Sequence, residues 1–116
     1  MTLSEVIRLC DTLSPNCLDE SLKIGWLSEA EGTIAARITG QAVKPYSTAT
    51  DPDTELLVAY PFDMIYRHFL LAQIALAHGE YERYNNSILC YNTALNAFAA
   101  FHRRTAGSGE KGPWRA

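Results

Sequence analysis

Residues 81–102 read YERYNNSILCYNTALNAFAAFH, the most regular helical pattern in the chain. Large side chains recur along it at alternating intervals of three and four residues: Tyr81, Tyr84, Ile88, Tyr91, Leu95, Phe98 and His102. This spacing places them on one stripe of an α-helix, and such a stripe packs against other helices. The pattern therefore predicts a long helix that ends near Arg104 and supplies the main core seam of a bundle.

The preceding segment predicts a second helix that pairs with the first. Pro61 is typical of a helix start and Asp63 of a first turn, while Gly79 is suited to the left-handed residue that ends a helix. Between them, apolar residues follow the helical period: Phe62, Ile65, Phe69, Ala72 and Leu76. Because the connection around Gly79 is short, we expect the two helices to form an antiparallel hairpin.

A further helix is predicted at the start of the chain. Thr2 and Glu5 have the spacing of a capping box, and apolar residues follow at helical intervals as far as Leu13. Pro15 disfavours helical backbone at the residue before it. This helix is therefore about three turns long.

Another helix is predicted from Leu18 to Ile38, where apolar residues again recur every four positions. Gly25 and Gly32 lie inside it, and each lowers helix stability relative to alanine. They mark either a weak point or the close approach of another helix. We favour close approach.

Residues 39–60 lose the helical period and are rich in glycine, proline, serine, threonine and aspartate. Connections of this length in compact domains are usually functional or disordered. Within the loop, residues 56–58 form a short apolar run that could pair as a strand or enter the core. The long loop is thus a candidate for function.

Composition places all of these elements in one domain. The chain has 116 residues, of which 47% are hydrophobic, enough to bury one core. We predict an all-α fold, a small four-helix bundle over residues 1–104 with a long loop between helices two and three. Residues 105–116 are predicted to form a flexible C-terminal tail.

Charge separates the tail from the bundle. From His102 onward four basic residues face one acidic residue, a net charge of +3, whereas the preceding residues sum to −6. A basic arm on an acidic body could dock on an acidic partner, on nucleic acid or, less favourably, on a membrane surface, or it could simply be solvated.

Patterns typical of catalysis or metal binding were not found. The chain lacks HExxH, paired CxxC and glycine-rich phosphate-loop motifs, and its three cysteines form no framework. Asp51, Asp53 and Glu55 alternate as calcium ligands can, but a solvated acidic loop explains them better. We therefore predict no enzyme, cofactor or metal site. No apolar stretch approaches the roughly 18 residues of a membrane span, so no membrane association is expected.

The remaining candidates are residues suited to contacts with another protein. Three asparagines lie on one face of the predicted fourth helix, where they could form hydrogen bonds between subunits or be solvated. Trp114 is the most suggestive residue of the tail, because tryptophan is a frequent interface anchor. The candidate interface residues are Asn85, Asn92, Asn96, Arg103, Arg104, Trp114 and Arg115.

Three segments carry a resemblance to a known family. They are DTELLVAYPFD at 53–63, followed by Tyr66; GEYERYNNS at 79–87; and WLSE at 26–29. Together they resemble the head–tail connector (adaptor) proteins of long-tailed phages and prophages, and the similarity covers most of the chain.

This resemblance implies a virion protein made in the host bacterial cytoplasm. It implies a four-helix subunit that assembles as a homo-oligomeric ring under the portal protein and meets a downstream head-completion or tail protein. DNA would pass through the ring without specific binding, which suits an acidic body. The alternative is a small helical regulatory or DNA-associated module that uses the basic tail on phosphates.

Overall fold

Four α-helices build the part of the chain that the structure describes. This computed structural model describes the backbone of residues 1–111 and the side chains of residues 1–106. The helices are α1 (Leu3–Leu13), α2 (Glu20–Ile34), α3 (Met64–Ala77) and α4 (Tyr81–Lys111), and a π-helical turn, η1 (Ala35–Thr39), extends α2. The predicted all-α, four-helix fold is confirmed.

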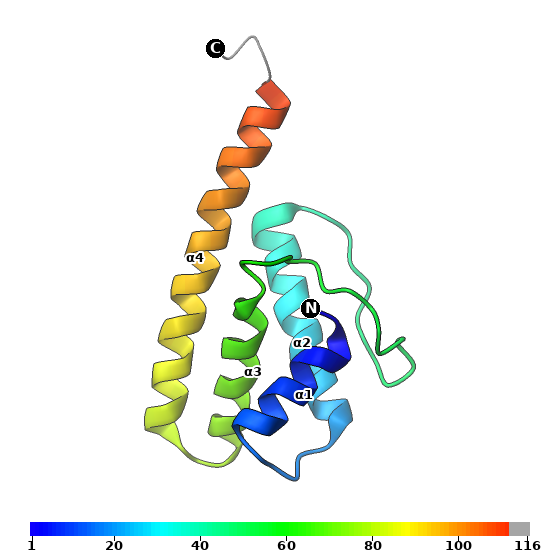
Figure 1. Cartoon of the computed structure of the whole chain (residues 1–116), viewed down its shortest axis with the longest axis vertical. Helices are drawn as coiled ribbons and strands as arrows, with labels where there is room; N and C mark the ends of the chain where they lie inside the picture. Colours follow the sequence, from blue (N-terminus) through cyan, green and yellow to red (C-terminus); the bar gives the residue numbers. More distant parts are fainter. Residues whose placement is uncertain (112–116) are drawn as a thin grey trace.

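Helix α3 lies in the middle of the bundle. It packs against α4 on one side and against α1 and α2 on the other, and α4 extends beyond the bundle (Figure 1). The apolar composition of α3 explains this position, because residues around much of its circumference are buried. Its buried residues are Ile65, Tyr66, Leu70, Ala72, Ile74 and Ala75.

The helix boundaries follow the predicted capping residues at two positions. The Thr2 hydroxyl accepts a hydrogen bond from the Glu5 amide at 3.2 Å, and the Glu5 carboxylate accepts one from the Thr2 amide at 2.8 Å. This completes the predicted capping box. Gly79 has a φ of 72°, the left-handed conformation expected after a helix, and α3 and α4 form the predicted hairpin.

Helix α3 begins three residues later than predicted. Residues 59–63 form turns instead, in which the Phe62 amide donates to the Ala59 carbonyl at 3.0 Å, and the Tyr60–Pro61 peptide bond is cis. Proline at a turn and proline at a first helical position have similar backbone angles, so the sequence did not distinguish them.

The two internal glycines of α2 do not mark a close helix contact. A Cβ atom built on Gly25 or Gly32 would have no neighbouring atom within 4 Å. The preference for close approach was therefore wrong, and both positions have room for a side chain.

Helix α4 continues past the end that the sequence predicted. It runs to Lys111, seven residues beyond Arg104, so residues 105–111 are helical rather than the start of a tail. The serine and glycine content of this segment suggested a break, but the helical hydrogen bonds of α4 extend through it. The rest of the predicted tail, residues 112–116, lies outside the described residues. None of the described helices is both long and apolar enough to cross a membrane.

Candidate protein interface

The three asparagines lie on one exposed face of α4. Asn85, Asn92 and Asn96 are all exposed, and their spacing places them within a narrow angle on the helix. Arg103 follows Asn85 by 18 residues, about five turns, and is exposed on the same face. We call Asn85, Asn92, Asn96 and Arg103 the Asn face.

An apolar residue lies beside the Asn face that the sequence analysis did not single out. Leu89 is 65% exposed, although it lies between Asn85 and Asn92 on a helix with a well-defined core stripe. Its position off the core stripe was the signal that could have identified it. Leu89 adds apolar area to a face otherwise formed by amide and guanidinium groups.

The other predicted interface residues are separated from the Asn face. Arg104 is exposed but lies about 100° around the helix from Arg103. Trp114 and Arg115 lie outside the described residues. The structure therefore brings four of the seven candidates onto one surface.

The core seam of α4 is buried only where neighbouring helices cover it. Tyr91 and Phe98 are buried, and Phe69 contacts Tyr91 with ring centroids 5.1 Å apart. Tyr81, the first residue of the helix, is 66% exposed. Near the other end, Phe62 packs against Phe101 at a centroid distance of 4.7 Å, and the helix beyond projects from the bundle (Figure 1).

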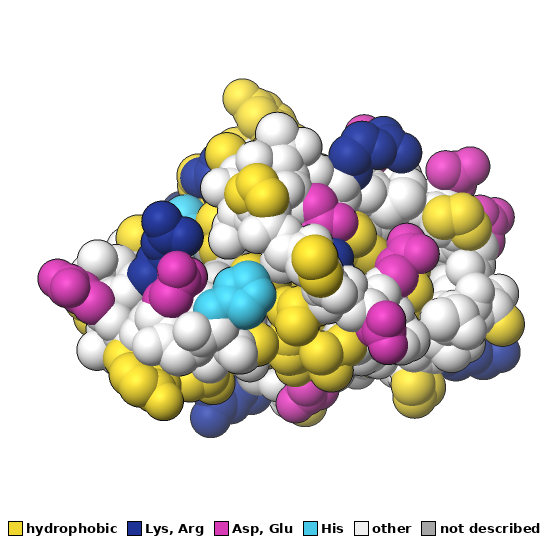
Figure 2. Space-filling model, turned by 90° about the horizontal axis from the view of Figure 1, so that it is seen from below, with side chains coloured by type: hydrophobic (Ala, Val, Ile, Leu, Met, Phe, Trp, Pro, Cys, Tyr) yellow, Lys and Arg dark blue, Asp and Glu magenta, His cyan; other side chains and the backbone are white. Residues whose placement is uncertain are grey.

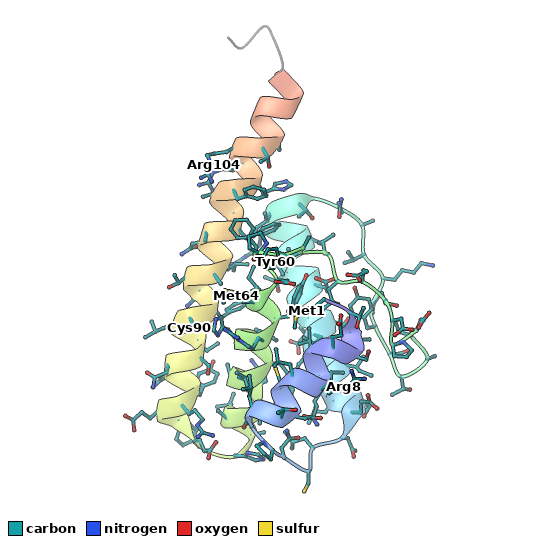
Figure 3. All side chains as sticks on the ribbon, viewed as in Figure 1. Met1, Arg8, Tyr60, Met64, Cys90 and Arg104 are labelled. Carbon is teal, nitrogen blue, oxygen red and sulfur yellow. The ribbon has the colours of Figure 1, made fainter. Side chains whose placement is uncertain are left out.

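An apolar groove runs between α3 and α4. It holds about 430 Å³, and Figure 3 labels Met64 and Cys90 on its two helices. Burial and the nearby Arg67 charge lower the pKa of His68 on its α3 wall, so that side chain favours the neutral form. The lining residues are Met64, His68, Leu89, Cys90, Thr93, Ala94 and Ala97. This groove can accept an apolar side chain and is hereafter called the α3–α4 groove.

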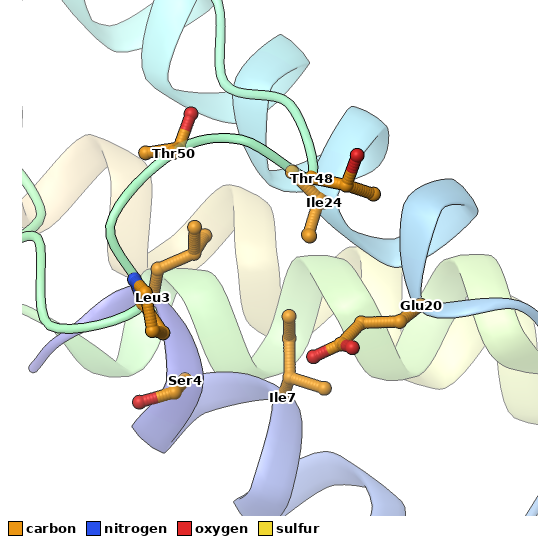
Figure 4. Close-up of a pocket in the computed structure, with 8 residues that line it drawn as sticks. Leu3, Ser4, Ile7, Glu20, Ile24, Thr48 and Thr50 are labelled. Atoms are coloured by element: carbon orange, nitrogen blue, oxygen red, sulfur yellow. The ribbon is translucent and has the colours of Figure 1, made fainter.

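A smaller hollow lies where the long loop arches over the starts of α1 and α2 (Figure 4). It holds about 160 Å³ and is lined by apolar residues of the helices and by hydroxyl groups of the loop. The Glu20 side chain points toward it. Its small size suits a few water molecules or one small group.

The long loop is anchored by a buried carboxylate. Glu31 of α2 is 1% exposed and accepts hydrogen bonds from the Tyr46 hydroxyl and the Leu57 amide, both at 2.8 Å, and from the Tyr66 hydroxyl. The Tyr66 hydroxyl also accepts a hydrogen bond from the Val58 amide at 2.8 Å. We call this set the Glu31 network.

The Glu31 network satisfies its polar groups within the protein. Burial, together with the adjacent carboxylate, raises the pKa values of Tyr46 and Tyr66, so both hydroxyls stay protonated and donate. Among the described residues, each buried side-chain nitrogen and oxygen has a hydrogen-bond partner. The loop is therefore held against the helices rather than free.

The apolar run of the loop, residues 56–58, enters the core instead of pairing as a strand. Leu56 and Val58 are buried, and the loop's one β-bridge is an isolated antiparallel pair between Thr2 and Glu55. No named strand forms within residues 1–111. The acidic residues Asp51 and Asp53 are exposed, and the described part of the chain contains no group of three or more metal-ligating side chains.

Charges of both signs are interspersed with apolar side chains at the end of the bundle seen in Figure 2. On that face, the described side chains form no continuous basic surface of the kind that binds nucleic acid.

Comparisons with protein-family models, with curated proteins and with solved structures found no match for this chain.

Proposed function

We propose that this chain is a structural head–tail connector subunit of a long-tailed phage or prophage, which assembles as a ring under the portal and extends the DNA channel. The observation that carries the proposal is helix α4, which projects beyond the bundle at its C-terminal end and exposes the Asn face along its length. The resemblance over residues 26–29, residues 53–63 with Tyr66, and residues 79–87 is its other support.

A ring subunit needs two different surfaces, because a head-to-tail contact closes only when one face meets another. The chain offers the Asn face and the α3–α4 groove on α4, and separate exposed surfaces on α2 and the long loop. The Glu31 network fixes the loop relative to the helices, so these surfaces keep a constant geometry. A fixed geometry favours closure of a ring.

The acidic character of the chain supports a conduit rather than a DNA-binding protein. The net charge is −3, and phosphate groups are repelled by acidic surfaces. The alternative, a regulatory or DNA-associated module, would rely on Arg103 and Arg104, which are exposed near the end of the described side chains.

The test is the mass of the particles, measured by light scattering during size exclusion, with and without a purified portal protein. The full chain is compared with a chain truncated after Arg104, and Asn96→Arg is compared with Thr12→Arg, which changes an exposed polar residue of α1. We expect portal binding or self-assembly by the full chain and by Thr12→Arg, and a loss for Asn96→Arg.

If the full chain and all of its variants stay monomeric and do not bind the portal, the connector proposal is contradicted. Fluorescence anisotropy with duplex DNA then separates the alternative. Binding that falls steeply with salt would favour the DNA-associated module, whereas weak binding at all salt concentrations agrees with a conduit.

A further inference from the structure

Helix α4 has one side that the rest of the bundle leaves uncovered. Among the helices of residues 1–111, only α3 and η1 pack against it, and it lies at the edge of the bundle (Figure 1). Leu89 and the buried Phe98 are nine residues apart, so they lie on opposite sides of the helix. The uncovered side is therefore centred near Leu89 and includes the Asn face.

This uncovered side carries no charge over about five turns of helix. Aspartate, glutamate, lysine and arginine are all absent from residues 84–101. The solvated face of a helix normally carries charged residues, whereas the centre of a protein contact is depleted of them. The exposed residues in this interval that point away from the bundle are Asn85, Asn86, Leu89, Cys90, Asn92, Thr93, Asn96 and Ala97.

Opposite charges border the two ends of this uncharged stretch. Glu82 and Arg103 are both exposed, and they lie one heptad before and two heptads after Leu89, on the same side of the helix. Within the described residues, no ion pair includes either of them. The helix dipole accounts for an acidic residue in the first turn, but Arg103 lies eight residues before the helix ends at Lys111, beyond the reach of this effect.

A second copy of α4, running antiparallel, complements both ends at once. If Glu82 of each copy lies opposite Arg103 of the other, the residues seven positions further in are also opposite, so Leu89 meets Asn96. Residues that repeat every seven positions stay on the contact line of two paired helices, so this register holds along the whole stretch. A parallel copy would instead place glutamate against glutamate and arginine against arginine.

We propose that two copies of the chain pair through their Asn faces, with the α4 helices antiparallel, Glu82 of each copy against Arg103 of the other, and Leu89 covered by the contact. Burial of Leu89, which is 65% exposed in a single chain, stabilises the pair, and the charges fix its direction and register. A contact between identical faces gives a closed pair rather than a ring. The pair is thus the form of the chain in the absence of a portal, and the inference goes beyond the proposed function.

Charge reversal tests the register, with the mass of the full chain measured by sedimentation in the absence of a portal and the fold verified by circular dichroism. Glu82→Arg places arginine against arginine at both ends of the pair, and Arg103→Glu places glutamate against glutamate. Each variant alone should raise the dimer dissociation constant by about tenfold or more. An equimolar mixture should recover dimers, because the two variants meet with opposite charges at both ends. Arg8→Glu, which reverses an exposed charge on α1, is the matched control and should dimerise as the unmodified chain does.

Crosslinking tests the direction of the two helices. In a background of Cys17→Ser and Cys90→Ser, the remaining native cysteine, Cys10, is buried. The double variant Glu82→Cys with Arg103→Cys is treated with a short bismaleimide, which cannot join two sites 21 residues apart, or about 32 Å, within one helix. We expect covalent dimers from the double variant. Each single variant should give only background levels, because identical sites lie far apart in an antiparallel pair.

The outcomes separate this inference from the proposed function. A full chain that stays monomeric at concentrations up to about 1 mM overturns the inference, and portal binding by the same chain would leave the connector proposal standing. The inference is also overturned if the mixture of charge variants recovers no dimers, or if the single cysteine variants crosslink as well as the double variant. A dimer with the expected crosslinks that does not bind the portal supports the inference and gives no support to the connector proposal, since a closed pair is not a ring.

Discussion

Removing the hydroxyl of Tyr66 should destabilise the fold far more than removing the hydroxyl of Tyr46. Both belong to the Glu31 network, and both substitutions to phenylalanine delete a single oxygen. They differ in what the oxygen does: the Tyr66 hydroxyl donates to Glu31 and accepts from the Val58 amide, whereas the Tyr46 hydroxyl only donates to Glu31.

The expected magnitudes follow from the partners left behind. Tyr66→Phe leaves the buried Val58 amide without an acceptor and one Glu31 oxygen without a donor, at about 1–3 kcal/mol each, or about 2–6 kcal/mol together. After Tyr46→Phe, the affected Glu31 oxygen still accepts from the Leu57 amide at 2.8 Å. That variant should lose about 0.5–1.5 kcal/mol, the net value of one hydrogen bond.

The free energy of unfolding is measured by urea titration with circular dichroism at constant pH. Tyr60→Phe is the matched control, because Tyr60 is 86% exposed and water can hydrate its hydroxyl in the folded chain. The order of stability should be unmodified chain and Tyr60→Phe, then Tyr46→Phe, then Tyr66→Phe. Equal losses at Tyr46 and Tyr66, within about 0.5 kcal/mol, would refute the assigned roles of the two hydroxyls.

Gly25→Ala should raise the free energy of unfolding by about 0.5–1 kcal/mol, because the new methyl group meets no atom and alanine favours a helix. Gly79→Ala should lower the free energy of unfolding, because φ is positive at Gly79, and urea titration distinguishes the two signs. Cys10 is buried, and burial raises the pKa of its thiol to about 12. A thiol reagent should therefore modify the other two cysteines of the folded chain and react with Cys10 only after denaturant is added. Labelling of all three cysteines at equal rates would contradict the buried position of Cys10. The pKa of His68 is lowered from 6.5 in the folded chain, so the stability that depends on a neutral His68 is complete above pH 6.5 and is lost as the pH falls below it. In thermal unfolding, His68→Gln should therefore lose less stability than the unmodified chain between about pH 7.5 and 5.5. An unchanged pH profile would exclude this role.

Local signals in the sequence were sufficient for the helices and their caps. The capping box at Thr2 and Glu5 and the left-handed Gly79 depend on residues close in the chain, and both occur as predicted. The core stripe of α4 was also correct at Tyr91 and Phe98, where neighbouring residues cover it. Periodicity identifies the stripe, but the extent to which neighbours cover it depends on tertiary packing.

Features that depend on distant residues were not predicted. Glu31 looks like an ordinary surface residue in the α2 sequence, yet its partners Tyr46, Leu57 and Tyr66 lie 15, 26 and 35 residues away. The same is true of the α3–α4 groove, which exists only because two helices lie side by side. For the Asn face, the helical period was sufficient to align its residues, and Leu89 was missed because it was not compared with the core stripe.

The Glu31 network also has a consequence for the order in which the chain folds. The α3–α4 hairpin can form outward from its short turn around Gly79, where the first contacts join residues near in sequence, so we expect it to form early. Closing the loop over α2 has no such local starting contact, joins residues 15 to 35 positions apart and places a carboxylate in the interior, so we expect it late in folding. Native interactions that are absent from the transition state govern the rate of unfolding rather than of folding. We therefore expect the loop contacts to slow unfolding and so to set how long a folded molecule keeps its shape.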